Sequence, residues 1–228
     1  MLDEEQARTR RHRGSPLDIA VPEDLTRLVS LSDGVFAFAM TLLVLNLVIP
    51  TSSQAPTNSA LWAYLRAQLQ GPFELYALGF LIVAVWWRLH VRVFRDIRSA
   101  DATIFWFDIC YLLLIGVTPF TVSLLLRFPA DAASSSFYSA TQALVGLTGA
   151  GIRLHCARRP ELCKGAPPTP RQVSVLFATP ALFGAATLVA LIAPIGAEVL
   201  WFSAVVVGNL VRRYDSAEGL RLKSGEVA

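Results

Sequence analysis

Ionisable side chains within long apolar stretches are the first candidates for chemistry in this sequence. Asp33 opens an uncharged run that continues to Ile49, and Arg88 and His90 lie near the end of a second run. A histidine beside a carboxylate titrates near physiological pH, which suits proton transfer or proton sensing. Polar groups inside a bilayer are costly unless they are paired, so we predict that Asp33 pairs with His90 or Arg88. Such a cluster either senses protons or only locks two helices together.

A second acidic residue, Asp108, lies in the middle of a third apolar run. An acidic side chain at membrane depth is a candidate functional group by default. The structural alternative is that Asp108 is neutral, or that it pairs with Arg88 or His90. The sequence leaves both readings open.

The run after Asp33 carries an apolar stripe with a single hydroxyl. A helix turns by about 100° per residue, which places four of its side chains on one face and directs Asp33 away from them. The four are Phe38, Thr41, Leu42 and Leu45, and Asn46 lies at the outer edge of the stripe.

The composition indicates which class of fold holds these residues in position. The chain has 228 residues, of which 54% are hydrophobic and only 16% charged, whereas soluble domains average about 25% charged residues. Its apolar runs do not alternate as barrel strands do, and each approaches the roughly 20 residues that a spanning helix needs. We therefore predict an all-α, polytopic membrane protein with a short amphipathic helix near 61–70. Its six spans lie at about 31–49, 72–94, 103–126, 137–154, 172–193 and 196–211.

The basic residues predict the orientation. Of the 20 Lys and Arg, all except Arg66 and Arg127 fall on one side of these spans, and the side rich in such residues is cytosolic. Both termini are then cytosolic in the plasma membrane, with tails at 1–25 and 215–228 and a six-helix channel domain at 26–214. This topology explains the net charge of +3, so nucleic acid is not an expected partner.

Other reactive residues predict little chemistry. Cys110, Cys156 and Cys163 are an odd set that forms no disulfide framework. The last two flank a loop placed in the cytosol, where thiols stay reduced, and with His155 they make a poor metal site. We expect neither an enzyme nor a bound cofactor. Three glycines in the fourth span, Gly146, Gly149 and Gly151, predict close helix packing.

The first two spans resemble those of the transmembrane protein 175 family, which includes the lysosomal potassium channel. Residues Arg27 to Leu45 read R-x-x-x-L-S-D-G-V-F-A-F-A-M-T-L-L-V-L, similar to the family's first-helix signature. In the second span, the family pattern W-x-N-H-H-R-x-F is matched at Trp87, His90, Arg92 and Phe94. The resemblance is specific in these two spans only.

The resemblance implies a homotetramer of six-helix subunits in the lipid bilayer, with the first helix of each subunit lining a central pore. The family's hydrophobic constriction falls on Phe38, Leu42 and Leu45, and its selectivity threonine on Thr41. Its cytosolic-side polar network falls on Arg27, Ser32, Asp33 and His90, to which position and depth add Arg88 and Asp108.

Several residues depart from the family pattern. The signature Phe is Leu31, and the innermost constriction residue is Phe38 rather than Ile or Leu. In the second span Leu89 and Val91 replace an Asn and a His, whereas Asp108 stands where the family often has Asn. Four phenyl rings around one axis would narrow or plug a pore, so conduction past Phe38 is an open point.

Three functions fit these patterns. The first is a passive channel for monovalent cations that favours K⁺ and is gated by dewetting of an apolar constriction. The second is a proton-coupled secondary transporter that uses Asp33, His90 and Asp108, although the paired broken helices common in transporters are not evident. The third is a non-conducting membrane scaffold, in which Phe38 only packs.

Overall fold

The computed structural model describes residues 22–164, 170–201 and 203, and this part of the chain is all-helical. The third apolar run forms α5, and the shorter turns η1 and η2 are 3-10 helices. The elements are α2 (Pro22–Leu42), η1 (Leu43–Asn46), α3 (Asn58–Leu69), α4 (Pro72–Arg95), α5 (Ala102–Arg127), α6 (Ala132–Arg158), η2 (Pro160–Leu162) and α7 (Pro170–Ala190).

The expected spans correspond to these helices, with differences at their ends. α4, α5 and α7 begin within two residues of the expected starts. α2 begins at Pro22 rather than at residue 31, because the polar turn before the apolar run is also helical. For the sixth span, residues 196–201 lie in a helical stretch that starts at 194. Residue 202, most of the remainder of that span, and both predicted tails apart from residues 22–25 lie outside the described residues.

Side-chain caps explain where several helices begin. Asp101 accepts the backbone N–H of Ile104 at 2.9 Å at the start of α5, and Asp131 accepts that of Ala133 at 2.9 Å at the start of α6. Asp is among the best N-cap residues because it satisfies amide groups that have no partner within the helix. α4 instead begins with Pro72 in its first turn, where a missing N–H costs nothing.

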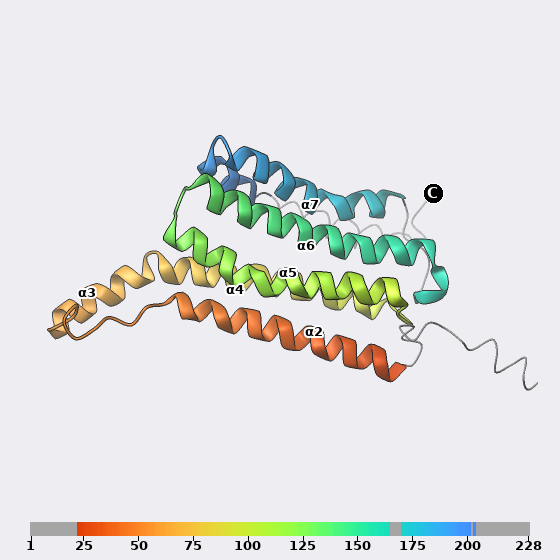
Figure 1. Ribbon diagram of the computed structural model, residues 1–228, viewed down its shortest axis with the longest axis horizontal. Coiled ribbons are helices and arrows are strands. Elements are labelled where there is room, and N and C mark those ends of the chain that lie inside the picture. Colours follow the sequence, from red (N-terminus) through yellow and green to blue (C-terminus); the bar gives the residue numbers. More distant parts are fainter. Residues whose placement is uncertain (1–21, 165–169, 202, 204–228) are drawn as a thin grey trace, which may run out of the picture.

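In Figure 1, α2 lies at one edge of the bundle and α7 at the other, with α4, α5 and α6 between them. α7 packs on α6, α6 on α5, and α5 on both α4 and α2. The described part of the chain thus leaves α2 at the opposite edge from α7, with one side free of other helices (Figure 1). α3 extends away from one end of the bundle, and its Tyr64 hydroxyl donates to the carbonyl of Val48 at 2.9 Å.

Small residues set the spacing between α5, α6 and α7. A Cβ added at Gly151 would lie 2.7 Å from Phe107 of α5, and one at Gly146 would lie 3.1 Å from Pro180 of α7. A Cβ added at Gly149 would lie 3.4 Å from the ring of Tyr111. The close packing expected of the fourth span is therefore confirmed.

Among the described residues, three stretches are long and apolar enough to cross a membrane: Leu25–Asn46, Asn58–Arg95 and Ala102–Arg127. α6 is long but less apolar, because one of its faces carries buried Ser134, Ser135, Ser139, Thr141 and Gln142. Those side chains lie among the other helices. α7 contains the apolar stretch Phe177–Ala190.

Candidate functional site: the exposed face of α2 and the polar cluster behind it

α2 has two faces of different character. Its packed face buries Leu28, Ser32, Phe36 and Ala39 to at least 95%, and Leu43 of η1 continues the row. The other face exposes most of the predicted stripe. Phe38 is 64% exposed and Leu45 74% exposed, Thr41 is exposed, and Leu42 is half-buried. The face predicted to border a pore is thus free of contacts with the rest of the described chain over most of its surface.

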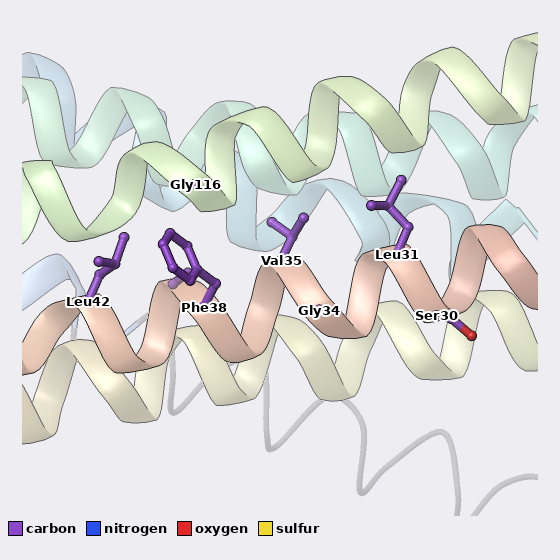
Figure 2. Close-up of a pocket in the computed structure, with 8 residues that line it drawn as sticks. Ser30, Leu31, Gly34, Val35, Phe38, Leu42 and Gly116 are labelled. Carbon is purple, nitrogen blue, oxygen red and sulfur yellow. The ribbon is translucent and has the colours of Figure 1, made fainter.

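Part of this face borders an apolar groove of about 490 Å³ between α2 and α5. Figure 2 shows Leu31, Val35, Phe38 and Leu42 along one side of the groove, with Gly116 of α5 opposite. The remaining lining residues are Ser30, Gly34 and Ala39. A Cβ at either Gly34 or Gly116 would meet no atom within 4 Å, so these glycines leave the groove wide.

Thr41 carries the only hydroxyl of the stripe, and its proton is already used. The Thr41 Oγ1 donates to the carbonyl of Phe38 at 2.9 Å within the same helix. A hydroxyl has one proton and two acceptor lone pairs. Because the proton points back to the helix, the lone pairs are left for a donor or a cation on the exposed face.

Asp108 is the centre of a buried polar cluster directly behind α2. It is 0% exposed, and its Oδ2 accepts the Ser32 hydroxyl at 3.1 Å. Its Oδ1 lies 2.7 Å from Nε2 of His90, which is 3% exposed. The cluster therefore joins one residue each from α2, α4 and α5. Of the readings left open for Asp108, the pairing with His90 is confirmed.

Aromatic rings close the cluster off. The His90 ring stacks on Phe94 with centroids 4.3 Å apart, and the centroids of Phe36 and Tyr111 lie 5.6 and 5.4 Å from it. Water is kept from the pair by these rings. A hydrogen-bonded pair held in such surroundings interacts more strongly than one at the surface, and its members are costly to leave unpaired.

The predicted pairing of Asp33 with His90 or Arg88 is wrong. Asp33 Oδ1 instead accepts the indole N–H of Trp87 at 2.8 Å, at an exposed position. The reason is the rotation of α2, which turns Ser32 inward toward α5 and Asp33 outward along α4. Arg27 and Arg88 are also exposed, and neither forms an ion pair within the described ranges.

Asn46 anchors the far end of the same segment. Its Oδ1 accepts the Ser123 hydroxyl at 2.6 Å, and its Nδ2 donates to the carbonyl of Leu43 at 3.1 Å. Both polar atoms of the side chain thus have protein partners, and the residue is half-buried. These bonds fix η1 on α5, and the predicted place of Asn46 at an outer pore mouth stays a prediction.

Two contributors were not identified from the sequence. The sequence matches Trp87 to the family pattern but does not mark it as the donor to Asp33, although a tryptophan next to a polar membrane entrance is a recognisable signal. Gly116 lines the groove, and nothing in its surroundings in the sequence marks it. Among the described residues, no group of three or more His, Cys, Asp or Glu side chains is arranged to hold a metal ion.

Two solved structures share this arrangement of helices. A solved structure, the lysosomal potassium-selective channel TMEM175 homolog from Chamaesiphon minutus, has a TM-score of 0.67 over 81% of this chain and 96% of its own. A variant of the potassium channel MtTMEM175 has a TM-score of 0.55 over 84% and 93%. The sequence identities are 23% and 18%, so these structures establish the fold.

The sequence comparisons match one family over part of the chain. Residues 27–119 match the model described as endosomal/lysosomal potassium channel TMEM175, which confirms the resemblance found in the first two spans. A potassium channel from Streptomyces collinus is 29% identical over 119 residues, 52% of this chain and 56% of its own. The endosomal/lysosomal proton channel TMEM175 of Danio rerio is 28% identical over 136 residues, 60% of this chain and 26% of its own. The chain thus spans about half of the first relative and a quarter of the second.

Proposed function

We propose that this chain is the subunit of a cation channel that favours K⁺, in which four copies surround a pore lined by α2. The observation that carries the proposal is the exposed apolar face of α2, whose Phe38 and Leu45 side chains are 64% and 74% exposed. The relative from Streptomyces collinus is named a potassium channel, which supports the same activity. The polypeptide then has six membrane-spanning helices, with both termini on the cytosolic side of the plasma membrane.

The constriction works by dehydration. Rings of Phe38, Leu42 and Leu45 offer an ion no oxygen ligands, so the passage is narrow and poorly wetted. Conduction through such a passage is controlled by whether water fills it. The exposed Phe38 ring is the largest of these side chains and therefore sets the narrowest point.

Thr41 supplies the polar contact within this passage. Its proton is donated to the carbonyl of Phe38 at 2.9 Å, so four copies would present a ring of hydroxyl oxygens as acceptors. Oxygen ligands partly replace the hydration shell of a cation. Such a ring would discriminate between K⁺ and Na⁺ through the different cost of dehydrating the two ions.

The experiment is ion flux with the full chain reconstituted in liposomes. We expect K⁺ flux, and we expect Thr41→Ala to lower the preference for K⁺ over Na⁺. Thr41→Ser is the matched control, since it keeps the hydroxyl and should keep the preference. A folded, reconstituted protein without flux would rule out the channel, whereas flux with unchanged selectivity in Thr41→Ala would rule out only the role of Thr41.

Proton movement is the second candidate, and the buried pair of His90 and Asp108 favours it. Their side chains lie 2.7 Å apart, with side-chain exposures of 2% and 0%, and the relative from Danio rerio is named a proton channel. Proton-coupled transport predicts saturable counterflow driven by a pH gradient. A channel for K⁺ predicts flux that does not saturate in this way.

A non-conducting scaffold makes the opposite prediction at Phe38. If the ring only packs, Phe38→Ser lowers the stability of the assembly and creates no leak. If the ring forms the constriction, the same substitution wets the passage and increases K⁺ leak, as measured by the liposome flux described above.

A further inference from the structure

The end of the bundle where α4 and α6 finish holds two thiols within one small apolar cluster. Cys156 lies in the last turns of α6 and is 9% exposed, and Cys163 is partly buried against the same cluster as Cys156. The core of that cluster also includes Ile97 and Ile152, which are 0% and 1% exposed. Neither thiol takes part in the face of α2 or in the cluster around Asp108.

The backbone brings Cys163 back toward α6. Helix α6 ends when the N–H of Arg159 bonds to the carbonyl of His155 at 3.0 Å, and the turn η2 follows. The N–H of Cys163 then bonds to the carbonyl of Pro160 at 3.2 Å, which reverses the chain. Both cysteines pack in the same apolar cluster. Burial, and after it the neighbouring Cys163 thiol, raises the pKa of Cys156.

The returning segment is held by the loop between α4 and α5. Cys163 forms an isolated antiparallel bridge with Ile97. The N–H of Lys164 bonds to the carbonyl of Asp96 at 2.7 Å, and the N–H of Arg98 bonds to the carbonyl of Leu162 at 2.8 Å. These bonds fix Cys163 on both sides, so its approach to Cys156 does not depend on a loose loop.

We propose that Cys156 and Cys163 form an oxidisable dithiol at this end of the bundle, which hydrogen peroxide converts to an intramolecular disulfide. The Cys163 thiolate attacks the peroxide first, because it is the more accessible of the two and a thiolate is the reacting species. The O–O bond breaks, hydroxide leaves, and Cys163 becomes a sulfenic acid.

Cys156 completes the reaction. Its sulfur attacks the sulfenic sulfur, the S–S bond forms, the S–O bond breaks and a water leaves with the Cys156 proton. The hydroxide released in the first step takes up the proton that the Cys163 thiol lost, and becomes the other water. The net change is two thiols and one hydrogen peroxide giving one disulfide and two waters, so both thiols lose one electron each. A cytosolic dithiol of this kind is reduced at rest and becomes oxidised only under oxidant stress. The disulfide covalently ties the last turn of α6 to the segment bound by the α4–α5 loop.

The sequence allows a direct test by peptide mapping of the full-length protein in detergent. Trypsin cleaves after Arg153 and Arg158, so the two cysteines fall on separate peptides, LHCAR and RPELCK. After reduction, removal of the reductant and treatment with hydrogen peroxide, we expect a cross-linked pair of these peptides that is two hydrogens lighter than their sum. It should come from the monomer band of a non-reducing gel and disappear on reduction.

Cys110→Ser is the matched control, since Cys110 is exposed on α5, and it should give the same cross-link as the wild type. Cys163→Ser should abolish the cross-link, and because Cys163 is only half-buried this variant tests the proposal even if Cys156→Ser does not fold. The proposal is overturned if folded wild-type protein carries sulfinic acid on Cys163 without the cross-link. It is equally overturned if the only disulfides join separate copies of the chain.

Discussion

At the scale of single residues, Asp108 is the side chain on which most other polar contacts converge. It receives the Ser32 hydroxyl at 3.1 Å and lies 2.7 Å from His90. Its two carboxylate oxygens each serve a different helix. A single buried acid thereby holds α2 to α4 through α5, so its first role is to fix how α2 is rotated and which of its faces remains exposed.

Two substitutions of Asp108 distinguish the contribution of its hydrogen bonds to stability from that of its charge. Asp108→Ala leaves Ser32 and His90 without their partner in a buried site, and we expect a loss of about 3 kcal/mol or more in the free energy of unfolding. Asp108→Asn has one acceptor and one donor that can serve Ser32 and a neutral His90, so its loss should be smaller. Thermal unfolding in detergent measures both, and equal stability of Asp108→Ala and the wild type would contradict this account.

Asp101 gives a prediction with a defined pH dependence. Burial opposes ionisation, but the N–H of Ile104 and the side chain of His155 stabilise the carboxylate, and the net effect is that the pKa of Asp101 is lowered. Because the pKa of Asp101 is lower in the folded state, its carboxylate adds stability at pH values above its unfolded pKa of about 3.9. That added stability is lost as the pH falls below this value and through the lower pKa of the folded state. We expect Asp101→Ala to cost about 1 kcal/mol at neutral pH and progressively less in acid.

The matched control for the cap is Asp101→Asn. Asn caps helices as well as Asp does, but it carries no charge for His155, whose Nε2 lies 2.7 Å from the Asp101 Oδ2. This variant should keep the cap and lose the pH dependence. Unfolding curves measured from neutral pH to well below the unfolded pKa of about 3.9 decide the point. Parallel pH profiles for the wild type and Asp101→Asn would show that the charge is irrelevant.

At the scale of elements, the spacing of α5 and α6 depends on a missing side chain. A Cβ at Gly151 would lie 2.7 Å from Phe107, so Gly151→Ala must push the helices apart or move the ring. Overpacking of this kind costs about 1–3 kcal/mol, and we expect a lower unfolding temperature. Gly184→Ala is the matched control, because nothing lies within 4 Å of its added Cβ, and the higher helix propensity of Ala adds up to about 1 kcal/mol. Unchanged stability of Gly151→Ala would mean that the two helices are not in close contact.

The positions of the helices were predictable because apolarity and turn residues mark them. α4 begins at Pro72 and ends at Arg95, close to the predicted 72–94, since a proline and a basic turn bound the apolar run. The partner of Asp33 was not predictable in the same way. Position near the end of the second apolar run brought Arg88 and His90 near Asp33, but which side chain of α4 faces Asp33 depends on the rotation of α2 against α4. That rotation is set by the buried contacts of Phe36 and Ser32.

The amphipathic helix α3 also has one feature that the sequence predicts and one that it does not. A short helix was expected near 61–70, and α3 runs from Asn58 to Leu69 with Trp62 59% exposed. Its start is set by Thr57, whose hydroxyl accepts the N–H of Ala60 at 3.2 Å. A cap of this type is readable from sequence. The direction in which α3 leaves the bundle is not readable, because it depends on the turn before Pro72.

At the scale of the whole molecule, the exposed face of α2 requires a partner or a bilayer. Phe38 and the next residue, Ala39, lie on the same turn of the helix and differ in surroundings, with exposures of 64% and 1%. If four copies meet along α2, a cysteine at position 38 faces its equivalents near the axis. We expect Phe38→Cys, in a chain whose three cysteines are replaced by serine, to form covalent dimers on mild oxidation in membranes.

Ala39→Cys provides the internal comparison, because a thiol one position later points into its own subunit and should give no dimers under the same conditions. The contrast depends only on which face of α2 is shared, so it tests the assembly apart from any conduction. Dimers from both variants would indicate collisions within the membrane and not a fixed interface. Dimers from Ala39→Cys alone would mean that α2 is rotated by about 100° from the arrangement argued above, and Phe38 would then no longer face the axis of a tetramer.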